Sequence, residues 1–164
     1  MKQGTLHYRT DVLPLDPQGI RDIIESTGFF RPDEVEVAAS LAVEHLEKGE
    51  ESGYHFIFAE GDNHVLGFAC YGPIPCTVSS YDLYWIAVRL EVQGKGVGHD
   101  LLWLCEKEIR RMGDTRVYIE TSSRDQYDPT RRFYVNSLYS QAALLEDFYA
   151  PGDAKVIYFK VLPP

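Results

Sequence analysis

The stretch that decides the fold is Val88–Leu102, VRLEVQGKGVGHDLL, in which glycine stands at positions 94, 96 and 98. An unbroken apolar run, Leu83–Val88, leads into it, and apolar residues then recur with the spacing of one helix face. Glycines spaced this closely are needed where the backbone turns tightly or where another group approaches it. The pattern therefore predicts a buried strand, a glycine-rich loop and an amphipathic helix.

A loop of this kind directs several free N–H groups to one point, and the following helix N-terminus adds about half a positive charge there. Together with the ammonium of Lys95, these groups form a site for an anion, most often a phosphate or pyrophosphate. The plainer alternative is a flexible turn between strand and helix. The glycine spacing matches neither a nucleoside-triphosphate loop nor a dinucleotide-binding loop, so neither site is predicted.

Outward from the loop, hydrophobic periodicity predicts a mixed α/β fold. The expected strands are 5–9, 54–60, 65–71, 78–88, 116–121, 142–149 and 155–162. The expected helices are 16–27, 32–48, one that follows the glycine loop and ends before Gly113, and 129–138. Because Leu83–Val88 is apolar throughout, its strand should be central in the sheet and buried on both faces. The unit at 78–122 should be a right-handed parallel crossover, and Glu106 is expected on the polar face of its helix.

Composition excludes several classes of protein. The chain has 164 residues, of which 45% are hydrophobic, enough for the core of one domain of ordinary size. Its formal charge of −9 argues against a nucleic-acid-binding module, which needs a basic face. The longest apolar run, Leu83–Val88, is far shorter than the roughly 20 residues that a membrane-spanning helix needs. We therefore expect neither a nucleic acid nor a membrane as partner.

Cysteine and histidine usage points away from disulfides and metals. Cys70, Cys76 and Cys105 are the three cysteines, and none forms a C-x-x-C pair. The five histidines are scattered without the spacing of metal ligands, so no metal is expected. Residues 1–5 also lack the apolar segment of a secretory signal. These features together predict a cytoplasmic location with reduced thiols.

The sequence Gln93-x-x-Gly96-x-Gly98 at a strand-to-helix junction resembles the Q/R-x-x-G-x-G/A signature of the GNAT superfamily, the acetyl-CoA-dependent N-acetyltransferases. The lead-in Ile86-Ala87-Val88 and the later Arg132-Phe133-Tyr134 are similar to further parts of that family's pattern. Two positions depart from it. Leu138-Tyr139 stand where related sequences usually have Gly-Phe, and Tyr127 stands where many have Asn.

The resemblance implies one GNAT-like acyl-CoA N-acyltransferase domain over residues 1–164, with a central mixed sheet of seven strands and about four flanking helices. It also implies acetyl-CoA as co-substrate, with its pyrophosphate on the glycine loop and its pantetheine arm along the end of the preceding strand. Carried over to this sequence, the cofactor-binding residues are Ile86, Ala87, Val88, Gln93, Gly94, Lys95, Gly96, Val97, Gly98 and His99.

Acetyl transfer to an amine requires a base that takes the proton of the amine and an acid that protonates the leaving thiolate. By its place in the resembling motif, Tyr134 is the predicted acid, with Tyr139 as the alternative. Glu120, on the strand that follows the loop helix, is the predicted base. Asp82, on the strand before that helix, and a chain of water molecules are the alternatives.

The predicted function is transfer of an acetyl group from acetyl-CoA to a primary amine of a small molecule, an amino acid or a peptide. The reaction would proceed by direct attack in a ternary complex. A non-catalytic acyl-CoA-binding sensor or regulatory module is the alternative. The acceptor itself is not identified by the sequence, and exposed edge hairpins would allow a homodimer.

Overall fold

The computed structural model describes residues 5–164; residues 1–4, which contributed to the expected location, lie outside the described part. The described strands are β1 (His7–Arg9), β2 (His55–Gly61), β3 (His64–Pro73), β4 (Ser80–Val88), β5 (Arg116–Ser122), β6 (Ser140–Ala150) and β7 (Asp153–Val161). The α-helices are α1 (Asp16–Thr27), α2 (Pro32–Lys48), α3 (Val97–Arg111) and α4 (Asp128–Asn136). Short 3₁₀ helices, which the sequence did not predict, are η1 (Gly49–Ser52), η2 (Leu90–Val92) and η3 (Asp125–Tyr127).

The strands form one sheet in the order β1-β2-β3-β4-β5-β7-β6. β4 and β5 run parallel, with Ser80–Leu83 opposite Arg116–Ile119, so the predicted crossover through α3 is present. The pairs β1–β2, β2–β3, β5–β7 and β6–β7 are antiparallel. The predicted fold class, a mixed seven-stranded sheet with four helices, is therefore confirmed for the described residues, and β4 is the central strand.

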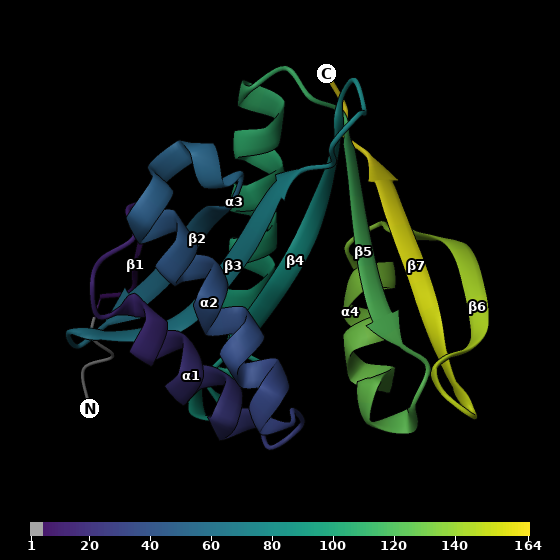
Figure 1. The fold of residues 1–164 in the computed structure, drawn as a ribbon, viewed down its shortest axis with the longest axis horizontal. Helices are drawn as coiled ribbons and strands as arrows, with labels where there is room; N and C mark the ends of the chain where they lie inside the picture. The colour runs from purple at the N-terminus through teal and green to yellow at the C-terminus, as the bar shows by residue number, and fades with distance from the viewer. Residues whose placement is uncertain (1–4) are drawn as a thin grey trace. The chain divides into compact units, whose positions relative to one another are not determined.

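The chain divides into two compact units. The first comprises Met1–Gly72 and Trp85–Lys107, and the second comprises Pro73–Tyr84 and Glu108–Pro164. In the first unit α1 and α2 lie across one face of β2 and β3 (Figure 1). Their buried side chains form one apolar cluster with those strands: Ile20, Ile23, Ile24, Val35, Ala38, Ala39, Ala42, Phe56, Phe58, Phe68 and Cys70.

Helix α3 packs on the opposite face of β3. A Cβ atom placed on Gly67 would come within 3.2 Å of Leu101 Cδ1, so the missing side chain lets the helix approach the strand. The buried face of α3 is broader than predicted, because Leu102 and Glu106, one helical turn apart, are both buried. The expectation that Glu106 faces solvent is therefore wrong.

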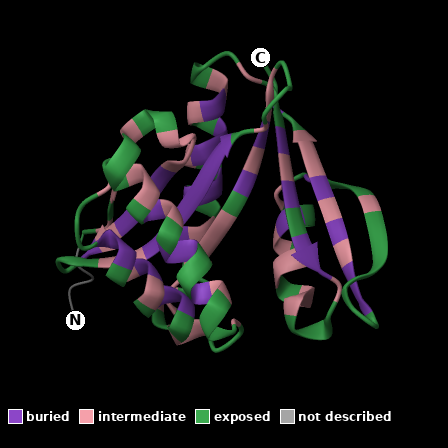
Figure 2. Ribbon diagram, viewed as in Figure 1, coloured by how far each residue is buried: buried purple, intermediate pink, exposed green. Residues whose placement is uncertain are grey.

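In the second unit, α4 packs against β7, where the rings of Tyr134 and Tyr158 are 5.9 Å apart. Val117 and Ile119 of β5 and Val156 of β7 are buried as well. β6, at the edge of the sheet, is exposed along most of its length (Figure 2). The second unit thus has a small aromatic and aliphatic core with an open outer strand.

The end of β4 differs from the prediction of burial on both faces. Tyr84 is 37% exposed, and Trp85–Val88 are only partly buried. Trp85 and Ala87 pack against the α1–α2 cluster, which leaves the alternate side chains without that cover. No helix of the described residues is both long enough and apolar enough to cross a membrane.

Candidate active site

The glycine loop lies in the first unit, between the end of β4 and the start of α3. Gly94 has φ 73° and Gly96 has φ 87°, backbone angles that residues other than glycine rarely adopt. A Cβ atom added at either position would meet nothing within 4 Å. Glycine is therefore required here by the backbone conformation, and the space above the loop is open.

The main-chain N–H groups of this loop are available to a ligand. Asp100 N–H donates to the carbonyl of Gly96 at 3.0 Å, as expected where α3 begins. Within residues 5–164, the N–H groups of Gly94–His99 donate to no protein carbonyl. Consecutive unpaired N–H groups at a helix N-terminus form a site for an anion. The loop therefore leaves its N–H groups open to a ligand, as a pyrophosphate site requires.

Side chains before the loop hold its backbone in place. Gln93 Nε2 donates to the carbonyl of Val88 at 3.1 Å. Arg89 N–H donates to Leu66 O at 2.8 Å, and Arg89 Nε donates to Val65 O at 3.0 Å, which ties the chain after β4 to β3. The side chain of Gln93, predicted to bind the cofactor, is thus engaged in shaping the loop.

The charged groups around the loop are mostly solvent-exposed. Lys95 is exposed, and His99 is 70% exposed with its Nδ1 atom 4.0 Å from Asp100 Oδ1. Asp100 also accepts a hydrogen bond from Tyr8 Oη of β1 at 2.7 Å. Burial, followed by the charge and hydrogen bond of Asp100, raises the pKa of Tyr8 above its ordinary value. Lys95 lies within the run of unpaired N–H groups, and its exposed ammonium is available to an anion bound there.

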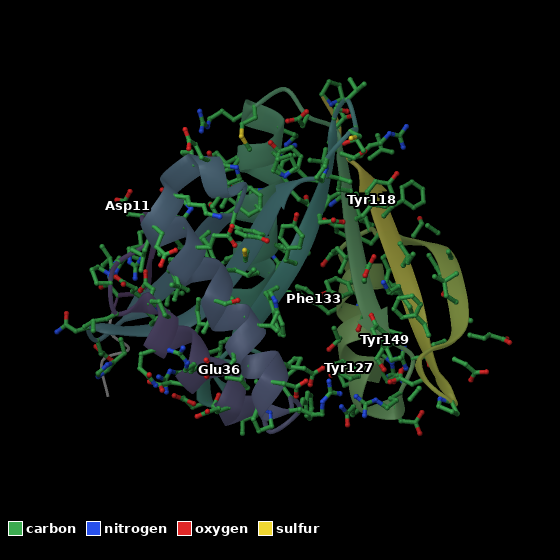
Figure 3. The ribbon with its side chains drawn as sticks, in the orientation of Figure 1. Asp11, Glu36, Tyr118, Tyr127, Phe133 and Tyr149 are labelled. Carbon is green, nitrogen blue, oxygen red and sulfur yellow. The ribbon has the colours of Figure 1, made fainter. Side chains whose placement is uncertain are left out.

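Tyr134, the predicted acid, lies in the core of the second unit. It is 4% exposed, and the rings of Phe133, Tyr139 and Tyr158 have their centroids 5.4 to 6.1 Å away. Figure 3 shows the neighbouring Phe133 on α4. Within residues 5–164 its hydroxyl makes no hydrogen bond, and the hydroxyl oxygen is not fully buried, unlike the ring. Burial raises the pKa of Tyr134, so the phenol keeps its proton until a strong acceptor is placed against it.

The two positions that depart from the family pattern have distinct local structures. Leu138 is 76% exposed and has φ 69°, a conformation that favours glycine, so leucine occupies a position where glycine would be unstrained. Tyr139 is 3% exposed and packs beside Tyr134, and the ammonium of Lys160 lies 5.4 Å from its ring centroid. Tyr127 lies in η3, under the guanidinium of Arg124.

The two candidate carboxylates lie on neighbouring strands of the second unit. Glu120, the predicted base, is 48% exposed and its Oε2 atom is 2.6 Å from Nζ of Lys155 on β7. Asp82 is half-buried on β4, directly opposite Tyr118 of β5. Burial raises the pKa of Asp82, the charge of Glu120 raises it further, and the charge of Lys155 opposes both. The structure thus brings both candidates together with a lysine that sequence reasoning missed.

No signal in the sequence links Lys155 to Glu120, which lies on another strand, although a lysine within a largely apolar strand is unusual.

Within residues 5–164 no group of metal-binding side chains is present. Cys70 and Cys105 are buried, Cys76 is exposed, and none of the three forms a disulfide. Burial raises the pKa of Cys70, as it does for an inert packed thiol.

Comparison with known proteins identifies the family. The model of the acetyltransferase (GNAT) family matches residues 20–137. The chain belongs to the GNAT family of acetyltransferases. A protein from Desulfovibrio desulfuricans assigned to this family has a crystal structure that superposes with a TM-score of 0.95 at 45% identity, covering 97% of this chain and 100% of that one. No curated protein sequence is significantly similar to the chain.

More distant structures share the fold of this GNAT protein. An aminoglycoside 6'-N-acetyltransferase complexed with coenzyme A has a TM-score of 0.77 at 16% identity, covering 98% of each chain. The ribosomal-protein-S18-alanine N-acetyltransferase from Escherichia coli has a TM-score of 0.78 at 16% identity, covering 98% of this chain and 96% of that one. At this identity the likeness concerns the fold alone.

Proposed function

We propose that this GNAT protein transfers an acetyl group from acetyl-CoA to a primary amine of a small molecule, an amino acid or a peptide. The amine attacks directly in a ternary complex. The observation that carries the proposal is the run of unpaired main-chain N–H groups at Gly94–His99, directly after the central strand. The coenzyme A bound to the similarly folded aminoglycoside enzyme, and the alanine acceptor named for the ribosomal-protein enzyme, are consistent with it.

The residues of the first unit fit coenzyme A. The N–H groups of the loop and the dipole of α3 would hold the pyrophosphate, and Lys95 would add a positive charge. The backbone of Ile86–Val88, at the partly buried end of β4, would pair with the pantetheine amides as an added strand does. A backbone N–H in this segment would stabilise the oxyanion. When bound, acetyl-CoA supplies an acyl group activated as a thioester.

The residues of the second unit supply proton transfer. Tyr134 is the proposed acid for the leaving thiolate; the residue is buried, and its hydroxyl keeps its proton and makes no hydrogen bond in the described part of the chain. The base is drawn from the carboxylates Glu120 and Asp82. The formal charge of −9 favours a cationic acceptor through the field of the whole protein.

Two measurements on the purified protein test the proposal. Calorimetry should show acetyl-CoA binding, and a thiol-release assay with a panel of small amines, amino acids and peptides should show acetyl-dependent turnover. Binding without thiol release for any amine would favour the sensor alternative. Absence of binding would reject the assignment of the loop.

The location and the oligomeric state form part of the same proposal. A cytoplasmic location is supported by Cys70 and Cys105, which form no disulfide, and cell fractionation tests it. A homodimer is supported by the edge strand β6, which exposes Leu144, Leu145 and Phe148. Sedimentation at micromolar concentration should then give twice the mass of the chain, and a monomer would reject the dimer.

A further inference from the structure

Three charged side chains share one face of the sheet in the second unit. Asp82 lies opposite Tyr118 in the parallel ladder, and Glu120 follows Tyr118 by two residues, so both carboxylates are on the same face. Lys155 lies opposite Ser122, which follows Glu120 by two residues. The register alone therefore places Asp82, Glu120 and Lys155 on this face, from three different strands.

The ammonium of Lys155 is fixed from two sides. Its Nζ atom is 2.6 Å from Glu120 Oε2 and 3.9 Å from the centroid of the Phe148 ring, and the ring of Tyr149, labelled in Figure 3, is 5.9 Å away. The lysine side chain is only 14% exposed. An ammonium held by a carboxylate and an aromatic face has little freedom to leave Glu120.

Asp82 has no such partner. Within residues 5–164 its carboxylate makes no hydrogen bond or ion pair. It is half-buried, and the charge of Glu120 acts on it directly. A carboxylate in these surroundings holds a proton more readily than one in water, which brings its affinity for protons closer to what a general base requires.

Building on the proposed function, we infer that Lys155 is a positioning residue that holds Glu120 as a paired anion and leaves Asp82 to accept the proton of the acceptor amine. Protonating Glu120 would break its ion pair with Lys155, whereas protonating Asp82 breaks no contact and relieves its repulsion with Glu120. The two carboxylates thus have different tasks, although each was a candidate for the same one.

Two protons leave the acceptor nitrogen during acetyl transfer. The acceptor ammonium gives one proton to Asp82, and the free amine attacks the thioester carbonyl. A C–N bond forms, the C–S bond breaks, and the thiolate leaves. The acid protonates the thiolate, and the nitrogen then loses its second proton, which restores the acid. The products are the acetylated amine, free coenzyme A and one proton, which Asp82 returns to water.

Two variants should shift the pH dependence of kcat/KM in opposite directions. The charged groups that act on Asp82 are Glu120 of β5 and Lys155 of β7, and Tyr118 is the titratable group opposite it. Lys155→Met removes a charge that lowers the pKa of Asp82, so the acid limb should move up by about one pH unit. Glu120→Gln removes a charge that raises this pKa, so the limb should move down.

Controls separate this role from a structural one. Lys155→Arg should restore the wild-type profile. Lys160→Met removes a second lysine of β7, whose Nζ donates to Ser137 O and lies over Tyr139, so it should leave the limb in place. Asp82→Asn should abolish the limb and lower kcat at least about 100-fold. Calorimetry with acetyl-CoA verifies that each variant is folded.

The outcomes distinguish the inference from the proposed function. Opposite shifts for Lys155→Met and Glu120→Gln, with loss of the limb in Asp82→Asn, support the inference. A limb that persists in Asp82→Asn, or that disappears in Glu120→Gln, overturns it while leaving the acetyltransferase intact. A wild-type protein that binds acetyl-CoA but acetylates no amine in the panel overturns both.

Discussion

The glycine loop of the first unit and the charged face of the second expose different parts of the chain. The loop offers main-chain N–H groups, and its side chains are mostly exposed or absent. The face of Asp82, Glu120 and Lys155 offers side chains whose backbone is engaged in ladder pairing. Substitutions should therefore act on the loop through backbone conformation and added charge, and on the second unit through the identity of each functional group.

Positive φ angles give a second contrast between the two regions. The loop fills its positions at 94 and 96 with glycine, whereas the second unit fills a similar position, after α4, with Leu138. Glycine adopts a positive φ without strain, so the loop keeps the one conformation in which its N–H groups are exposed. The turn after α4 accommodates a strained leucine between an intact helix and an intact strand.

The largest effect is expected at Tyr134. Tyr134→Phe removes the hydroxyl and keeps the buried ring among its aromatic neighbours, so kcat should fall about 100-fold or more. The Kd for acetyl-CoA should stay unchanged, because the phenol of Tyr134 is not among the groups proposed to hold the pyrophosphate. Steady-state kinetics and calorimetry measure the two quantities. If Tyr139→Phe lowers kcat and Tyr134→Phe does not, the acid is Tyr139.

The loop is tested by a pair of glycine variants. Gly96→Glu introduces a carboxylate and a strained backbone at the anion site, and should weaken acetyl-CoA binding about 10-fold to 100-fold. Gly113→Glu is the matched control, because Gly113 has φ 89° and equally open surroundings but lies beyond the other end of α3. It should lose similar stability and keep its Kd. Equal affinities for both variants in calorimetry would remove the site.

The loop could be predicted from the sequence because its function rests on local features. The order of an apolar strand, closely spaced glycines and an amphipathic helix is contiguous, and each glycine reports a backbone requirement. The strands and α-helices were also predictable, since hydrophobic periodicity marks each of them, whereas the short 3₁₀ helices were not. The half-exposure of Tyr84–Val88 and the burial of Glu106 were not, because they depend on which neighbours cover a face.

The charged face could not be predicted, because its members come from three strands that are far apart in the sequence. Glu120 and Lys155 meet only through the register of β5 with β7, and Phe148 reaches Lys155 from the irregular part of the β6–β7 pairing, between Leu145 and Ala150. Periodicity gives the face of a residue within its own strand but not its partner on the next one. A side-chain site of this kind requires the structure.

A smaller effect on the loop is expected from its lysine. Lys95→Ala should raise the Kd for acetyl-CoA about threefold to tenfold at low salt, and the difference should shrink in 0.5 M salt, as expected of an exposed charge near a phosphate at roughly these ionic strengths. Lys107→Ala is the control: its Nζ atom lies over the Trp103 ring, further along α3. Titrations at two salt concentrations compare them. A salt-independent loss at Lys95 would indicate a role other than charge.

The smallest effect concerns stability at Leu138, and it has the opposite sign. The backbone of Leu138 is strained at φ 69°. Its side chain is 76% exposed, so its removal loses few contacts. Relief of roughly 1–2 kcal/mol of strain exceeds the entropy cost of glycine in the unfolded chain, roughly 0.5–1 kcal/mol, so Leu138→Gly should stabilise the fold by about 0.5–1 kcal/mol.

The control lies one turn earlier, at a helical position that is exposed as well. Val135→Gly, inside α4, should destabilise the protein by up to about 1 kcal/mol, because glycine is a poor helix former there. Urea unfolding monitored by circular dichroism gives both values. Opposite signs at Leu138 and Val135 would show that backbone conformation, and not the loss of an apolar side chain, decides each outcome. A destabilised Leu138→Gly would mean that leucine makes contacts there that outweigh its strain.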